Sequence, residues 1–342
     1  SMRVLVPERK KVMIDLIDKK ILYLLSHNAR FSYSTIAKHV NLSREAVKQR
    51  IVRLQEKKVL LGFQTVVNLK LLKQISYHIF VQLQNPKKVI AEKFAQESVK
   101  NPKTNAILKY TGKFDFELAY VVPDTNSLNE ELKDLSAKQL KSQMVCQLLQ
   151  TVTSKVYPKC MYNFSLELQK IGRDGSFHSG FGKTQQEVTL DNTDYKILTL
   201  LANDARITMV NLASKLEISV DTVIYRIKKL IKGKIIVAFR PIINYAALEY
   251  SVYTLFFQFK NFTIEKEKKF AGFLKQHPNV LWSAQCLGGV DNITYIIVKN
   301  NFHFHDVITE FREKFNEIIE NYESLLTFAE YKYTYFPEVL HR

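Results

Sequence analysis

Glycine, proline and cysteine are scarce in this chain, with 10, 8 and 3 of them among 342 residues. So little glycine and proline excludes a collagen-like or low-complexity chain. The three cysteines lie far apart and form no CxxC pair, so neither a disulfide framework nor a structural zinc site is expected. No apolar run approaches the ~20 residues of a membrane span, and the first residues lack the apolar core of a signal peptide. These absences predict a cytoplasmic protein.

Positive charge is in excess. The chain contains 50 Lys and Arg against 33 Asp and Glu, a net charge of +17, in an ordinary globular composition with 46% apolar residues. Such a balance favours a polyanionic partner, although a basic protein without one has the same composition. The position of the charge along the chain decides between these interpretations.

The sequence is a tandem repeat with a constant offset of 176 residues. The segment DKKILYLLSHNAR from Asp18 aligns without a gap with DYKILTLLANDAR from Asp194, and the match continues to Asp115 and Asp291. A repeat of this length means that one module is present twice. Between the copies, residues 172–182 hold four of the ten glycines, which is typical of a flexible linker.

Each copy begins with a pattern of three short helices. In the first copy, Ser43 can cap the third helix, along which Val47, Ile51 and Leu54 form one apolar stripe. Asn41 stands in the preceding turn, where a left-handed residue is expected, and Asn adopts that conformation more readily than most residues. This layout is that of a helix-turn-helix, although a plain three-helix bundle has the same pattern.

The positive charge is concentrated in these helical segments. Residues 1–60 carry +9 and residues 194–240 carry +5, whereas the other 235 residues together carry +3. Phosphate contacts require charge that is clustered in this way. The helical segments are therefore predicted to bind double-stranded DNA.

The outward face of each third helix is the predicted reading surface. Arg and Gln suit guanine and adenine edges in the major groove, and Lys and Arg also anchor phosphates. A solvated charged face is the alternative interpretation. In the second copy, Val220, Asp221 and Ile224 make the face less basic. The predicted DNA-binding residues are Arg44, Glu45, Lys48, Gln49, Arg53, Tyr225 and Lys228.

Each copy continues with alternating strands and helices. After a strand at 59–69 that leads out of the helices, the first copy shows strands at 77–83, 105–112, 114–122 and 147–157 and helices at 89–99 and 127–140. This βαββαβ order is ferredoxin-like, and the second copy repeats it. Helices cover one face of such a sheet, so the other face must be buried against a second copy, either in the same chain or in another.

The predicted fold class is therefore α+β, with two tandem copies of a winged or helix-turn-helix domain followed by a ferredoxin-like βαββαβ effector domain. The predicted boundaries are 1–60 for the first helix-turn-helix, 61–160 for the first effector and dimerisation domain, 161–190 for the linker, 191–236 for the second helix-turn-helix and 237–342 for the second effector domain.

Two segments resemble the Lrp/AsnC family, the feast/famine transcriptional regulators. They are IDLIDKKILYLLSHNARFSYSTIAKHVNLSREAVKQRIVRLQEKKVLLGF and TGKFDFELAYVV. The resemblance covers nearly the whole chain, twice. It implies sequence-specific DNA binding, a homodimer or higher homo-oligomer that pairs its sheets, and an amino-acid effector held near the TG-x-x-D loop. The tandem arrangement departs from the usual single-module chain.

The loop residues that the resemblance assigns to the effector are Thr111, Gly112 and Asp115, with Gly288 and Asp291 in the second copy. Turn chemistry alone also explains Gly and Asp at such a loop. In the second copy, Leu287-Gly288-Gly289 replaces Thr-Gly-Lys, which weakens the case for an effector there.

Two other functions compete with regulation. Sirohaem decarboxylases resemble this family in fold and carry a His-Asn-Tyr-x-Arg segment near the second strand, where this chain has Leu108-Lys109-Tyr110-Thr111 without His or Arg. An architectural protein that coats DNA without an effector is the second alternative. We expect a regulator that is not an enzyme and has no cofactor. No metal site is expected either, because His303 and His305 have no third ligand placed by the sequence.

Overall fold

Each repeat contributes to two separate compact units. The computed structural model describes residues 12–164 and 189–341. The helical unit contains residues 12–73, 161–164, 189–244 and 334–341, and the barrel unit contains residues 74–160 and 245–333. Most of the predicted linker at 161–190, and the first residues of the predicted first domain, lie outside the described residues.

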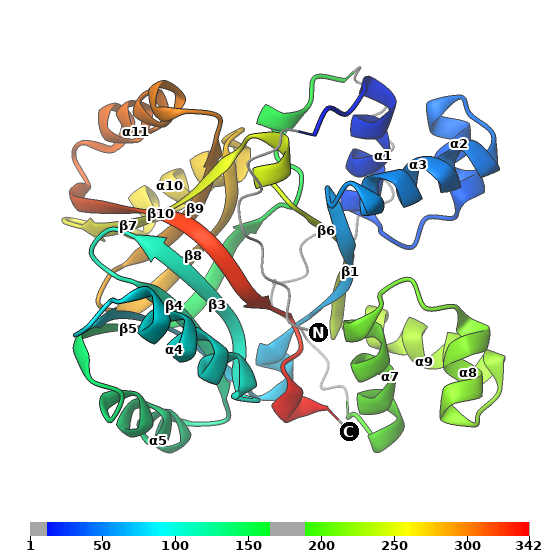
Figure 1. Cartoon of the computed structure of the whole chain (residues 1–342), viewed down its shortest axis with the longest axis horizontal. Helices are drawn as coiled ribbons and strands as arrows, with labels where there is room; N and C mark the ends of the chain where they lie inside the picture. Colours follow the sequence, from blue (N-terminus) through cyan, green and yellow to red (C-terminus); the bar gives the residue numbers. More distant parts are fainter. Residues whose placement is uncertain (1–11, 165–188, 342) are drawn as a thin grey trace. The chain divides into compact units, whose positions relative to one another are not determined.

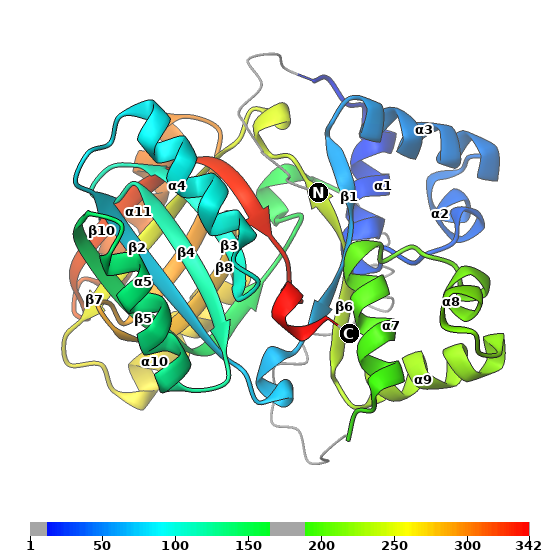
Figure 2. The same ribbon diagram turned by 60° about the horizontal axis from the view of Figure 1, so that its bottom comes forward.

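In the helical unit, two sets of three helices share one two-stranded ribbon (Figure 1). Its elements are α1 (Leu16–His27), α2 (Tyr33–Val40), α3 (Arg44–Glu56), β1 (Leu60–Val67), η1 (Leu69–Leu72), α7 (Asn192–Asn203), α8 (Met209–Leu216), α9 (Val220–Lys232), β6 (Ile236–Ile243) and η4 (Glu338–Leu340). Figure 2 shows both sets of helices on the same side of the ribbon.

The ribbon places a local two-fold axis between the repeats. β1 and β6 run antiparallel, with Gln64 opposite Arg240, which is the same position in each repeat. The predicted boundaries at 60/61 and 236/237 assign these strands to the effector domains, whereas the structure groups them with the helices. The reason is that the two strands hydrogen-bond to each other and satisfy their backbone groups within the helical unit.

In the barrel unit, eight strands form one closed sheet with the helices outside it (Figure 1). Its elements are β2 (Ile75–Leu83), α4 (Lys88–Lys100), β3 (Thr104–Thr111), β4 (Phe116–Val122), α5 (Thr125–Ser136), β5 (Leu140–Ser154), η2 (Lys159–Met161), η3 (Ala246–Leu248), β7 (Ser251–Phe259), α10 (Ile264–Gln276), β8 (Val280–Gly288), β9 (Asn292–Val298), α11 (Asn301–Phe315) and β10 (Ile319–Tyr333).

The two ferredoxin-like sheets pair with each other inside one chain. The strand order is β10-β3-β4-β2-β5-β8-β9-β7, with β10 returning to β7. The last strand of each half therefore bridges to the other half, β5 to β8 and β10 to β3. This double pairing explains why β5 begins at Leu140, seven residues before the predicted strand at 147. The open face of each sheet was predicted to be buried against a second copy, in the same chain or in another, and the second copy lies in the same chain.

The repeat offset changes once, at the last helix. α5 has 12 residues and α11 has 15, and after this insertion β5 and β10 correspond at an offset of 179. With this offset the two bridging contacts are equivalent, since Thr111 faces Leu326 and Leu287 faces Gln147. The barrel, taken by itself, thus has approximate two-fold symmetry between its halves.

Apolar side chains fill the space between the helices and the outer surface of the sheet. In the first half, Phe94 of α4 packs on Phe116 of β4, with ring centroids 5.2 Å apart. In the second half, Phe257, Phe270 and Phe311 form the corresponding cluster. Among the described residues, no helix combines the length and apolarity that crossing a membrane requires.

Candidate nucleic-acid interface

Capping side chains set where the second and third helices of each repeat begin. Ser32 caps α2 and Ser43 caps α3, each accepting a backbone N–H bond, at 3.0 and 3.1 Å. Asn41 has φ 53° and ψ 50°, so the predicted left-handed turn is confirmed. Glu217 takes the same conformation at φ 56° in the second repeat, although Glu adopts it less readily than Asn. Both repeats therefore form the same helix-turn-helix.

The inner stripe of each third helix packs against the helices before it. In α3, Val47, Ile51 and Leu54 are at most 1% exposed. Their counterparts in α9, which are Val223, Ile227 and Leu230, are at most 3% exposed. The opposite faces are consequently turned to solvent.

The outward faces carry most of the predicted DNA-binding residues, and they differ between the repeats. Arg44, Glu45, Lys48 and Gln49 of α3 are exposed. On α9, Asp221, Tyr225 and Lys228 are exposed, with Tyr225 at 69%. Val220 and Ile224 are partly buried. The first face is basic, and the second is mixed and carries an aromatic ring.

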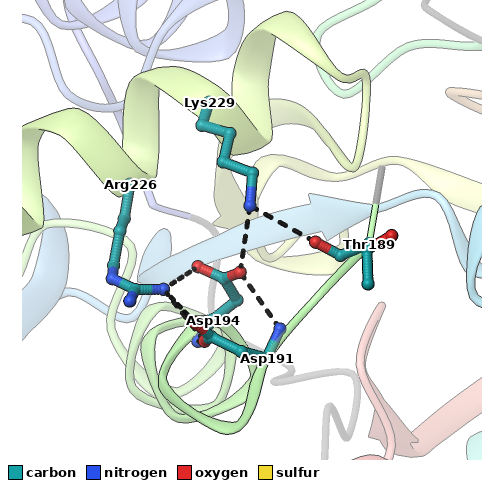
Figure 3. Close-up of polar contacts among 5 residues, drawn as sticks. All are labelled: Thr189, Asp191, Asp194, Arg226 and Lys229. Carbon is teal, nitrogen blue, oxygen red and sulfur yellow. Dashed lines mark hydrogen bonds and ion pairs between the residues drawn. The ribbon is translucent and has the colours of Figure 1, made fainter. Parts of the chain in front are cut away.

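A pair of aspartates anchors each third helix to the first helix of its repeat. Asp191 and Asp194 form a capping box at the start of α7, and Arg226 Nη1 donates to both carboxylates at 2.8 Å (Figure 3). Lys229 Nζ lies 3.6 Å from Asp194 and 3.3 Å from the Thr189 carbonyl oxygen. Asp194 is 0% exposed, so these contacts compensate a buried charge.

The first repeat has the same anchor. Arg50 Nη1 donates to Asp15 at 2.6 Å and to Asp18 at 2.8 Å, and Arg53 Nη2 donates to Asp18 at 2.8 Å. Arg53, a predicted DNA-binding residue, is thus directed back towards α1, although its side chain is 45% exposed. Asp18 and Arg50 recur as Asp194 and Arg226 at the repeat offset of 176, and none of the four was among the predicted site residues. Their recurrence at the repeat offset was the available signal.

The charges of this anchor stabilise one another. The backbone N–H of Asp194 and the guanidinium of Arg226 hold the pKa of Asp191 below its ordinary value. Hydrogen bonds to Asp191 and Asp194 raise the pKa of Arg226. Because the ionised forms are favoured, the third helix is tied to the first by a charged contact throughout the neutral pH range.

The predicted effector residues lie in two hairpin turns of the barrel unit, β3–β4 and β8–β9. The Asp115 carboxylate accepts the Leu83 backbone N–H at 2.8 Å, and the Asp291 carboxylate accepts the Phe259 backbone N–H at 2.7 Å. Both aspartates therefore tie a hairpin to the end of a neighbouring strand. Thr111 at the first turn is exposed.

Gly112 and Gly288 occupy backbone conformations that side chains rarely adopt, with φ 144° and 125°. A Cβ at Gly112 would lie 2.6 Å from Leu325 Cδ2, and one at Gly288 would collide with the Val145 carbonyl oxygen. In each case the close neighbour belongs to the bridging strand of the other half. Their positive φ angles favour glycine at both positions, and at Gly288 the nearby backbone of the other half leaves no room for a side chain.

A buried polar cluster lies in the interior of the barrel, and none of its residues was among the predicted site residues. Glu117 is 0% exposed, and its Oε1 contacts His78 Nδ1 and accepts the Tyr295 hydroxyl at 2.6 Å. Its Oε2 accepts the Tyr110 hydroxyl, which also lies 2.8 Å from Thr254 Oγ1. Burial and the charge of Glu117 raise the pKa of both tyrosines, so their hydroxyls stay protonated as donors.

Two capped helix-turn-helix units with solvent-facing third helices, joined in one chain to a pair of ferredoxin-like halves, are features of regulators that bind DNA. The comparisons agree with this class. Residues 14–55 match the AsnC-type helix-turn-helix domain, and residues 190–237 match a winged helix-turn-helix DNA-binding domain.

Relatives match over most of their length as well. An uncharacterised HTH-type transcriptional regulator of Pyrococcus abyssi is 31% identical over 130 residues, which is 38% of this chain and 84% of the relative. One of Pyrococcus horikoshii is 31% identical over 134 residues, which is 39% and 83% of the two chains. The leucine-responsive regulatory protein of Rhizobium meliloti is 29% identical over 146 residues, which is 42% and 93% of the two chains. The chain belongs to the Lrp/AsnC family of transcriptional regulators.

A solved structure that resembles both repeats together is that of a sirohaem decarboxylase. The sirohaem decarboxylase NirDL superposes with a TM-score of 0.61 at 12% sequence identity, over 93% of this chain and 92% of the other. At this identity the likeness shows a shared fold alone. It shows that the tandem arrangement with both modules in one chain occurs in another protein.

Proposed function

We propose that this chain is a sequence-specific DNA-binding transcriptional regulator in which α3 makes the dominant contacts. The observation that carries the proposal is the exposed outward face of α3, where Arg44, Lys48 and Gln49 project from a helix whose position Arg50 fixes. A helix of this kind enters the major groove and presents its side chains to base edges. Glu45, Tyr225 and Lys228 complete the proposed contact set. For Arg53 we propose a phosphate contact made beside its bond to Asp18.

The salt dependence of binding tests the DNA-binding part of the proposal. Each phosphate contact releases counterions, so log K against log salt should fall with a slope of about −0.9 per phosphate. The measurement is a fluorescence-anisotropy titration of duplex DNA at several salt concentrations. A slope near zero, or absence of binding at low salt, would refute the regulator function.

Sequence specificity separates a regulator from an architectural DNA-coating protein. A regulator enriches a motif from random duplexes and binds it much more tightly than unrelated DNA, typically by 10³-fold or more. An architectural protein shows the same salt dependence with no enriched motif. Competition by unrelated DNA, measured at one salt concentration, distinguishes the two.

We also propose that an amino-acid-like effector acts at the hairpin turns, with Thr111, Gly112, Asp115, Gly288 and Asp291 as the candidate residues. What supports this second proposal is family membership together with the exposure of Thr111. The contacts of both aspartates within the barrel provide a structural role that does not involve an effector. A shift in DNA affinity on adding single amino acids, abolished by Thr111→Val, would support the site. An unchanged affinity with all of them would exclude it.

Enzymatic decarboxylation is the remaining alternative, and we propose that the chain is not an enzyme. His78 Nδ1 and the Tyr110 hydroxyl both contact the Glu117 carboxylate in the interior of the barrel, where each of the three residues is at most 8% exposed, so these groups are already engaged with one another's side chains within the fold. Incubation of the chain with sirohaem under reducing conditions, followed by mass analysis of the macrocycle, tests this. Loss of carboxylate mass would overturn it.

We propose that chains associate further into a homodimer or a higher homo-oligomer, as the family implies. The sheet faces already pair within one chain, so such an assembly would use other surfaces. Sedimentation distinguishes it from a 39.8 kDa monomer.

A further inference from the structure

Each set of helices in the helical unit is attached to the strand of the other repeat. The Ala29 backbone N–H donates to the Phe239 carbonyl oxygen at 2.9 Å, and the Ala205 N–H points to the Phe63 carbonyl oxygen at 3.4 Å. Thr65 Oγ1, buried in β1, donates to the Leu201 carbonyl oxygen of α7 at 2.8 Å. The two helix-turn-helix units are therefore interlocked through the ribbon.

Two arginines at the same position of each repeat strengthen this interlock. Arg30 Nη1 donates to the carbonyl oxygens of Ala205 at 2.7 Å and Ile207 at 3.1 Å. Arg206 Nη1 donates to the Ala29 carbonyl oxygen. The guanidinium carbon of Arg30 lies 5.4 Å from the centroid of the Phe239 ring, and that of Arg206 lies 4.8 Å from the centroid of the Tyr33 ring.

These contacts resist any rotation of one helix set relative to the other. Each arginine is partly buried and bonds to backbone carbonyls of the other repeat, so a rotation would leave desolvated charges without these partners. Together with the β1–β6 ladder, they fix the separation and orientation of α3 and α9. The backbone of the reading surface thus has two-fold symmetry.

The side chains of the reading surface do not share that symmetry. At the repeat offset, Arg44 corresponds to Val220, Lys48 to Ile224 and Gln49 to Tyr225. Arg and Gln match guanine and adenine edges, whereas apolar side chains contact the thymine methyl group. A symmetric dimer reads a palindrome because its two reading helices are identical. Here the geometry is that of a dimer, but the two helices require different half-sites.

We propose that one chain reads a single asymmetric DNA site, made of two unlike half-sites in inverted orientation at one fixed spacing. The half-site under α3 contains guanine or adenine contacted by Arg44, Lys48 and Gln49. The half-site under α9 is rich in thymine. Arg30 and Arg206 are the positioning residues that set the spacing. This inference rests on the proposed sequence-specific function and specifies its target.

The first experiment is selection from random duplex DNA with the full chain at a chain concentration low enough that one chain binds each duplex. The expected result is a motif of two different half-sites whose centres are about one helical turn, 10–10.5 bp, or a multiple of it apart. An inverted repeat of one half-site, or one half-site alone, overturns the asymmetric site and leaves the proposed function standing. Binding without any motif overturns both.

A transplant of the first reading face onto α9 gives the sharpest test. The variant Val220→Arg, Asp221→Glu, Ile224→Lys and Tyr225→Gln leaves the buried stripe of Val223, Ile227 and Leu230 unchanged. It is expected to select a palindrome of the α3 half-site, with the spacing of the wild-type site. Selection of the unchanged wild-type motif would show that α9 does not read DNA and would refute the proposal.

The spacing is tested separately, with the wild-type reading faces. Inserting about 5 bp between the half-sites turns them to opposite sides of the duplex and should weaken wild-type binding at least about tenfold. In the double variant Arg30→Gln, Arg206→Gln this loss should shrink severalfold, while circular dichroism reports that the helices persist. An equal loss of affinity in the wild-type protein and the double variant would show that Arg30 and Arg206 do not set the spacing. A wild-type protein that tolerates the insertion would overturn the fixed spacing.

Discussion

The two units differ in where the repeats have diverged. In the helical unit most buried positions hold the same or a similar apolar residue in the two copies, whereas the outward residues of α3 and α9 differ. In the barrel unit the difference lies in the interior. There Glu117 corresponds to Ile293, and Tyr295, which donates to Glu117, corresponds to Ala119.

This contrast shows what joining two modules in one chain permits. A homodimer places identical residues around its axis, so a pair of first halves would bring two Glu117 carboxylates into the interior and offer Ala119 in place of Tyr295. In the fused chain the first half supplies the Glu117 carboxylate as the acceptor, and the second half supplies the Tyr295 hydroxyl as a donor. The interior thus favours pairing between unlike halves, and the helical unit carries two third helices with different outward faces.

The largest effect should come from removing the centre of the interior cluster. Glu117→Ala leaves His78, Tyr110 and Tyr295 without their common partner, and we expect it to lower the free energy of unfolding of the barrel unit by about 4 kcal/mol. Urea unfolding followed by the fluorescence of Trp282, the single tryptophan, measures this.

The matched control is Glu323→Ala, the same substitution in a surface pair with Lys113, whose side chain is 57% exposed, and it should cost no more than about 1 kcal/mol. Equal losses for the two variants would mean that the cluster does not specify the pairing of the halves.

Acid should destabilise the second half of the barrel through His277. Burial lowers the pKa of His277 from its ordinary 6.5 to about 4, although the Glu310 carboxylate, 3.4 Å away, opposes this. Between pH 6.5 and 4 the unfolded chain binds the proton that the folded chain excludes. Stability present above pH 6.5 is therefore lost as the pH falls through this window, by up to about 3 kcal/mol at pH 4.

The first half provides the control for this pH dependence, because Asn101 stands at the position of His277. Asn101 Oδ1 accepts the Lys103 backbone N–H at 2.9 Å, as His277 Nδ1 accepts that of Asn279 at 3.1 Å. His277→Asn should therefore fold and show a flatter dependence of stability on pH. An unchanged profile in this variant would assign the acid sensitivity to other groups.

The anchors of the two helical sets should be equivalent. Asp18→Asn and Asp194→Asn each remove a buried charge that pairs with the third helix, and each should cost about 2 kcal/mol of stability. Thermal unfolding followed by circular dichroism compares the two variants with Asp221→Asn, whose carboxylate is exposed. Unequal losses of stability for Asp18→Asn and Asp194→Asn would contradict the equivalence that we infer for the two anchors.

The reading faces should not be equivalent, and the difference between them is the smallest effect. Arg44→Ala and Lys48→Ala should each weaken specific binding by roughly 1–3 kcal/mol. The losses caused by Asp221→Ala and Ile224→Ala should each be smaller than these by about 1 kcal/mol. Binding isotherms for the four variants on one selected duplex decide the ranking. Larger losses of binding free energy for the α9 variants would show that α9, the less basic helix, makes the dominant contacts with DNA.

Much of the fold was predictable because it depends on local sequence. Ser43 and Asn41 mark the turn before α3 through capping and left-handed preference, and both roles are confirmed. The βαββαβ order followed from strand and helix periodicity. The end of the helix predicted at 127–140 was wrong by four residues, because α5 ends at Ser136 and Gln139 takes φ 56°.

The candidate site was predictable only in part. The outward residues of α3 could be located, because helical periodicity separates them from the buried stripe. The interlocking arginines and the interior cluster could not, because their partners lie far away in the sequence. Arg30 bonds to residues 175 and 177 positions away, and Tyr295 bonds to Glu117 across 178.

The sequence alone determined that one module occurs twice, that each module is a helix-turn-helix followed by a ferredoxin-like half, and that the charge lies on the helices. Periodicity, capping and composition are local properties, so they can be recognised in the sequence without knowing which distant segments are in contact. The tertiary structure decided that β1 pairs with β6, that the two halves close one barrel, and that Arg30 and Arg206 join the two helix-turn-helix units. Strand pairing and buried polar contacts depend on which distant segments meet, and repeated segments can meet within a chain or between chains with nearly the same local sequence.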